Sequence, residues 1–118
     1  MAILGKDAFT PDKYVKVVKV NVPELGGEVC LCVMTARQKD NYDLSINDGK
    51  RQNLENICAR LVVRCLCDEQ GVHLFGDNIA EGERVLGDMP YPVIERLFEK
   101  CREINGMAES SVEDAAKN

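Results

Sequence analysis

Two runs rich in β-branched residues near the start of the chain predict a β-hairpin. The first run covers residues 14–22 and reads YVKVVKVNV, and the second covers residues 29–34 and reads VCLCVM. Branched side chains favour strands because they pack well on a pleated surface. Pro23 ends the first run, and Gly26 with Gly27 supplies the positive φ angles that a tight reversal needs. We therefore expect two antiparallel strands joined by a glycine turn.

After the hairpin, apolar residues recur at the spacing of helices. Thr35 and Gln38 form a capping-box pattern, which predicts a helix over residues 36–46. A second helix is expected over residues 50–66, because apolar positions there lie three and four residues apart: Leu54, Ile57, Cys58, Leu61 and Cys65. Val62 and Val63 leave open the alternative that a strand begins inside this segment. Residues 68–71 read as a turn, and residues 72–75 as a short extended piece.

Two more helices are expected in the second half of the chain. Asp77 is the expected N-cap of a short third helix that ends at Val85 or Leu86. A fourth helix is expected over residues 91–105, with prolines in its first turn and the Asn105-Gly106 pair as its stop. Its expected buried residues are Ile94, Leu97, Phe98, Cys101 and Ile104, and Ser110 or Ser111 is the expected cap of a last turn.

These elements predict an α+β fold, an N-terminal β-hairpin followed by a small bundle of about four helices. The length of 118 residues suits a single domain. We expect residues 1–13 to be a flexible lead, residues 14–107 to fold, and residues 108–118 to form a mobile tail.

The distribution of charge narrows the classes of partner. Residues 1–59 carry eight basic and eight acidic side chains, and residues 60–118 carry seven and twelve, which accounts for the net charge of −5. An acidic chain without a basic stripe is a poor ligand for nucleic acids and for anionic membranes. No apolar run is long enough to span a bilayer, and the first residues lack a secretory-signal pattern, so the six cysteines are expected to be thiols.

The sequence offers no residues for catalysis, for a cofactor or for a metal. Cys30 and Cys32, like Cys65 and Cys67, are separated by one residue, whereas structural zinc sites use a spacing of two to four. Core packing is therefore the expected role of most cysteines. The single histidine, His73, has no nucleophile signature around it, and no nucleotide-binding glycine motif is present. We expect a protein that acts by binding and not as an enzyme.

Two apolar features are candidate interaction surfaces. A two-stranded hairpin exposes edges that must pack on the helices or pair with another chain, so we expect a homo-oligomer formed through it. The fourth helix can offer an apolar groove around Tyr91, Ile94 and Phe98, although such side chains are more often core residues. The candidate interaction residues are Val15, Val17, Val33, Tyr91 and Phe98.

The order of several short motifs resembles the tail assembly chaperones of long-tailed bacteriophages and prophages. The motifs are VNVPELGG at residues 20–27, MTARQKD at residues 34–40, ARLV at residues 59–62, DEQG at residues 68–71, Leu74-Phe75, and the helical block IERLFEKCREINGM at residues 94–107. The resemblance covers residues 14–107. It implies that this part of the chain is a tail assembly chaperone domain. Two departures are Leu25, where the family commonly has an aromatic residue, and the large number of cysteines.

The resemblance implies a chaperone without catalytic residues or cofactors, made in the cytoplasm of the infected host and absent from the mature virion. Members of the family coat the tape measure protein and keep it soluble, and a longer product made by frameshifting recruits tail tube subunits. This role is physically reasonable, because the long apolar surfaces of a helical protein aggregate unless they are covered. The alternative is a structural or accessory component of the tail or virion.

Overall fold

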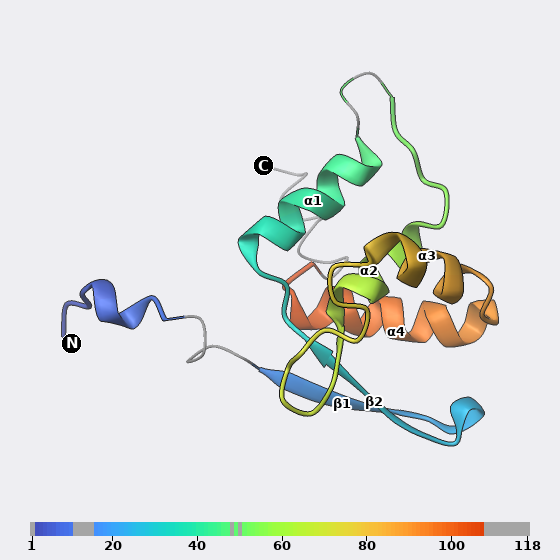
Figure 1. Ribbon diagram of the computed structural model, residues 1–118, viewed down its shortest axis with the longest axis horizontal. Helices are drawn as coiled ribbons and strands as arrows, with labels where there is room; N and C mark the ends of the chain where they lie inside the picture. The colour runs from blue at the N-terminus through green and yellow to red at the C-terminus, as the bar shows by residue number, and fades with distance from the viewer. Residues whose placement is uncertain (1, 11–15, 48, 50, 108–118) are drawn as a thin grey trace.

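The computed structural model describes residues 2–10, 16–47, 49 and 51–107. Figure 1 shows a β-hairpin on one side of the group of helices, with the N-terminal segment standing apart. The elements in chain order are η1 (Lys6–Ala8), β1 (Val17–Val22), η3 (Pro23–Leu25), β2 (Gly27–Cys32), α1 (Ala36–Ile46), α2 (Ile57–Cys65), β3 (Leu66–Cys67), α3 (Ile79–Gly87) and α4 (Tyr91–Ile104). The α+β prediction is confirmed.

The predicted hairpin is present and belongs to a three-stranded antiparallel sheet in the order β1-β2-β3. Its register runs from Val17 opposite Cys32 to Val22 opposite Gly27. The connection contains the 3-10 turn η3 and closes at Gly26, whose φ of 79° is the positive angle expected of a glycine there. Because β2 is central, β1 leaves one edge of the sheet unpaired within the described residues.

The tip of the hairpin is tied to α4 by an exposed ion pair. Arg96 donates to both carboxylate oxygens of Glu24, in one case at 2.8 Å. The guanidinium of Arg96 holds the pKa of Glu24 at about 2, well below its usual value. At the other end of the hairpin, the Met34 N–H donates to the Asn105 side-chain oxygen at 2.8 Å.

Local sequence signals set the start of α1 and the end of α4. The Thr35 hydroxyl accepts a bond from the Gln38 N–H at 3.1 Å, and the Gln38 side chain accepts one from the Thr35 N–H at 2.8 Å. At the end of α4, Gly106 has a φ of 69°, and the Met107 N–H donates to the Arg102 carbonyl at 2.7 Å. The predicted capping box is therefore present, and the predicted stop at Asn105-Gly106 takes the form of a Schellman motif.

The prediction for α2 is wrong at its start, because this helix begins at Ile57 and not near residue 50. Asn56 adopts a left-handed conformation with a φ of 56°, which interrupts the helical path before Ile57. The preceding loop is held by Arg60, whose guanidinium donates to the carbonyls of Ser45 at 2.9 Å and of Asn53 at 2.8 Å. The alternative that a strand begins at Val62 or Val63 is wrong, because both residues lie within α2. The two-residue strand β3, which follows the helix directly, was not predicted.

Two smaller predictions also need correction. The N-cap of α3 is Asn78 and not Asp77, because the Asn78 side chain accepts the bond from the Glu81 N–H at 3.3 Å. The extended piece after residue 71 is reduced to a single bridge at His73, and the chain turns from Leu74 onward. The Asp68 turn is as expected, with its carboxylate accepting bonds from two backbone N–H groups.

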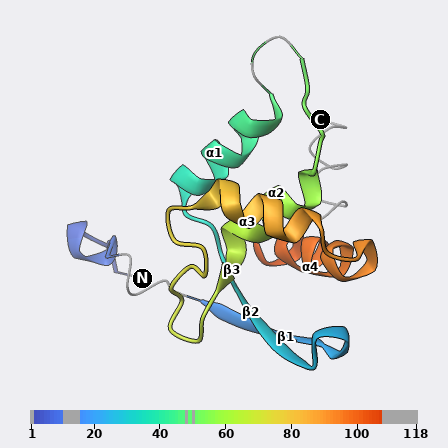
Figure 2. The same cartoon turned by 45° about the vertical axis from the view of Figure 1, so that its right-hand side comes forward.

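The core lies around α2, which packs against α1, α3 and α4 (Figure 2). Buried residues on α4 include Ile94, Leu97 and Cys101, as predicted, while Phe98 and Ile104 are half-buried. The most completely buried side chains are Val22, Leu31, Leu61, Val62, Val63, Cys65 and Cys101. All six cysteines are free thiols, and four of them are buried. The predicted cap at Ser110 or Ser111 and the tail over residues 108–118 lie outside the described residues.

Candidate functional site

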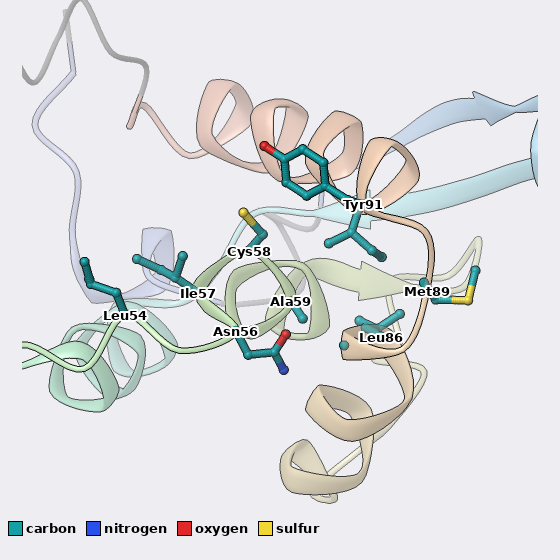
Figure 3. Close-up of a pocket in the computed structure, with 10 residues that line it drawn as sticks. Leu54, Asn56, Ile57, Cys58, Ala59, Leu86, Met89 and Tyr91 are labelled. Atoms are coloured by element: carbon teal, nitrogen blue, oxygen red, sulfur yellow. The ribbon is translucent and has the colours of Figure 1, made fainter.

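Two apolar grooves lie beside α4, one near each end of that helix. We call the first the Tyr91 groove. It is a cavity of about 240 Å³ where the start of α2, the end of α3 and the start of α4 meet (Figure 3). Its apolar lining is formed by Leu54, Ile57, Cys58, Ala59, Leu86, Met89, Tyr91 and Ile94.

The left-handed turn at Asn56 shapes the Tyr91 groove. It ends the loop before α2, so that Leu54 remains exposed at the border of the groove. The Asn56 side chain donates to the Glu83 carbonyl at 2.9 Å and packs against Gly87, which fixes the loop to α3. Tyr91 is the first residue of α4 and is 65% exposed. A hydrogen bond to Glu95 raises the pKa of the Tyr91 hydroxyl.

We call the second cavity the Phe98 groove. It has a volume of about 710 Å³ and lies between α1, the start of α2 and the end of α4. Its apolar lining is Tyr42, Ile46, Ile57, Phe98 and Met107, and charged side chains stand at its border: Lys39, Asp43 and Arg102. The Arg102 guanidinium lies 5.7 Å from the centre of the Phe98 ring. Burial raises the pKa of Tyr42 to about 12, so its hydroxyl stays neutral.

The two grooves form one apolar strip along α4. They share Ile57, which lines both cavities. Tyr91 and Phe98 are seven residues apart, about two helical turns, so both side chains lie on the same side of α4. An amphipathic helix of a partner presents apolar residues at the same spacing. The strip is therefore suited to an elongated apolar ligand.

The surroundings of two of the thiols raise their pKa values. The pKa of Cys67 rises to about 12, chiefly through burial, and burial is also the main cause of the raised pKa of Cys58. Raised values keep these thiols protonated near neutral pH, and the thiolate is the reactive form. His73 contacts the Gln38 side-chain nitrogen at 2.8 Å. Among the residues that the structure describes, no group of three or more His, Cys, Asp or Glu side chains could hold a metal ion.

The structure places the predicted interaction residues in two different regions. Tyr91 and Phe98 lie along the apolar strip. Val17 is half-buried at the start of the edge strand β1, and Val33 is exposed just after β2, near the same end of the hairpin. Val15 lies outside the described residues. The alternative that the aromatic residues of α4 are core residues does not hold for Tyr91, which is exposed.

Sequence reasoning missed several residues of the grooves. Leu54 and Ile57 were recognisable as apolar positions, but they were expected on one continuous helix and not on either side of a left-handed turn. Tyr42, Met89 and Met107 come from other elements or connections, and only the tertiary fold brings them to α4. In the part of the chain that the structure describes, no helix has the length and apolarity needed to cross a bilayer.

Comparisons with known proteins agree with this architecture. No protein-family model matches the sequence, and the curated proteins give no match. The fold is similar to a solved structure of the bacteriophage HK97 tail assembly chaperone, with a TM-score of 0.57 and 20% sequence identity. The match covers 92% of this chain and 91% of that chain. The resemblance drawn from the motifs is thus confirmed at the level of the fold.

Proposed function

We propose that this chain is a phage tail assembly chaperone that binds and solubilises the tape measure protein. The observation that carries the proposal is the apolar strip along α4, present in a chain whose fold resembles a tail assembly chaperone. The protein acts by covering apolar surface, without catalysis. It works in the host cytoplasm, forms homo-oligomers, is absent from the mature virion, and helps to recruit tail tube subunits through a longer frameshifted product.

The Phe98 groove is the part of the strip that receives the partner helix. It is the larger of the two grooves, and it lies between α1 and α4, which leaves room along its length for a helical segment. Helix-in-groove recognition depends on apolar anchors that repeat every three to four residues, which a long helical protein supplies many times. Lys39, Asp43 and Arg102 at the border are able to pair with polar residues that flank such a seam.

Replacing Phe98 with glutamine is expected to remove most of the tape measure binding. Glutamine keeps α4 helical but removes the apolar ring, and losing one well-buried aromatic anchor weakens binding by about tenfold or more. The measurement is the amount of tape measure protein that stays soluble and co-purifies when both proteins are expressed together.

Leu44→Gln is the matched control, because Leu44 is exposed on α1 but lines neither groove. It is expected to behave like the unmodified chain. Circular dichroism verifies that both variants are folded. Equal recovery of the tape measure protein with folded Phe98→Gln and Leu44→Gln would refute the assignment of this groove.

A further inference from the structure

The segment over residues 2–10, which we call the N-terminal arm, exposes large apolar side chains. Ile3 is 100% exposed, Leu4 70% and Phe9 79%. In Figure 1 the arm stands apart from the helices and the sheet. Apolar side chains gathered on a short exposed segment are typical of a segment that binds a partner.

The arm has a defined local conformation even though its side chains are exposed. The 3-10 turn η1 is closed by a bond from the Ala8 N–H to the Gly5 carbonyl at 3.1 Å and by one from the Phe9 N–H to the Lys6 carbonyl at 3.0 Å. The Thr10 hydroxyl adds a bond to the Asp7 carbonyl at 2.9 Å. A segment that already has its bound conformation loses less entropy when it docks.

The Tyr91 groove has the properties needed to receive this arm. It is apolar and open, and Leu54 and Tyr91 at its border remain exposed. Figures 1 and 2 show the arm at one end of the molecule and the α3–α4 connection, which borders the groove, at the other end. A ligand and its receptor site at opposite ends of one chain favour contact between copies in a head-to-tail arrangement.

The part of the chain that carries the arm is basic, and the border of the groove is acidic. Residues 1–16 contain three lysines and two aspartates, a net charge of +1, while the rest of the chain carries −6. The arm itself has one lysine and one aspartate, so the excess positive charge comes from the residues that follow it. At the groove, Glu95 is hydrogen-bonded to Tyr91. The negative charges of Glu95 and Glu99 both contribute to the raised pKa of Cys58. A basic segment beside an acidic border is steered into contact and held in one orientation.

We propose that the N-terminal arm of one copy docks in the Tyr91 groove of a second copy, with Ile3, Leu4 and Phe9 as its apolar anchors. Such a contact is heterologous, so it links copies head to tail and repeats along a row. The role of this row rests on the proposed function, in which the Phe98 grooves of successive copies bind along one tape measure protein. The contact itself needs no tape measure protein.

The first test is the mass of the full-length chain by sedimentation velocity over a hundredfold range of concentration. The mass of the unmodified chain is expected to rise with concentration. Phe9→Asp in the arm and Tyr91→Asp in the groove are each expected to raise the dissociation constant by about tenfold or more. Aspartate is compatible with the first turn of α4 because an acidic side chain stabilises a helix N-terminus. Val72→Asp is the control, since Val72 is exposed but belongs to neither surface.

Mixing the two defective variants gives the sharper result. Phe9→Asp keeps an intact groove, and Tyr91→Asp keeps an intact arm, so only one productive contact can form between them. We expect a 1:1 dimer and no larger species in the mixture, while each variant alone is a monomer at the same concentration. Thermal unfolding shows beforehand that both variants are folded.

Three results would overturn the proposal. The first is that the unmodified chain is monomeric at every concentration. An arm that docks in the groove of its own chain would give this result. The second is undiminished association of both variants, as pairing through the β1 edge would give. The third is a mixture that remains monomeric. Because no tape measure protein is present, these results are independent of the test of the proposed function.

Discussion

Replacing Gly82 with alanine is expected to lower the free energy of unfolding by roughly 2 kcal/mol, although alanine is the better helix former. Gly82 is buried in α3 against α2. A Cβ atom at this position would lie 2.1 Å from the Val63 Cγ2 atom and 2.9 Å from the Phe75 ring. Val63 is itself fully enclosed, so α3 must move away from α2.

This displacement would reach the candidate site, because Leu86 at the end of α3 lines the Tyr91 groove. Thermal and urea unfolding measure the loss, and the expected fall in the midpoint temperature is about 10 °C. Gly27→Ala is the control, since a Cβ atom there meets nothing within 4 Å. If Gly82→Ala were as stable as the unmodified chain, the close packing of α3 on α2 described above would be wrong.

Replacing Arg64 with alanine is the second change with a large expected effect. Arg64 is only 5% exposed, and its guanidinium links three helices. It donates to the Asn41 side-chain oxygen at 2.7 Å, to the Arg60 carbonyl at 2.6 Å and to the Glu83 carboxylate at 3.2 Å. Its removal takes one donor away from each of these acceptors and opens a cavity, so we expect a loss of about 3 kcal/mol in the free energy of unfolding.

Arg64→Met separates the two causes of that loss. Methionine fills part of the space of the arginine stem but offers no donor, so its expected cost is smaller than that of alanine. Urea unfolding of both variants provides the comparison. Equal losses would show that packing contributes little and that the hydrogen bonds dominate. No loss in either variant would contradict the role given to Arg64.

The hairpin, the start of α1 and the end of α4 were predictable because their signals are local. The Gly26 turn, the pair formed by Thr35 and Gln38, and Gly106 each act within a few residues of the chain. Nothing in the apolar spacing reveals the start of α2. It depends on the left-handed Asn56 and on the bonds that Arg60 makes to Ser45 at the end of α1 and to Asn53 in the loop before α2.

The candidate site was predicted only in part, for a similar reason. Tyr91 and Phe98 were recognisable as apolar positions on one side of a helix. The walls that turn this side into grooves come from α1, from the loop before α2 and from the segment after α4. Their positions follow from tertiary packing. The interaction roles of Val15, Val17, Val33, Tyr91 and Phe98 stay predictions, and so do the domain boundaries.

The most direct test of the chaperone proposal is to express the unmodified chain together with a tape measure protein from the same genome, and to determine the mass of the purified complex by light scattering. The expected result is a soluble complex with many copies of this chain on each tape measure protein, and purified virions that lack the chain. An insoluble tape measure protein and a chain that elutes alone would contradict the proposal. In that case, finding the chain in purified virions would identify it as a structural or accessory component of the tail.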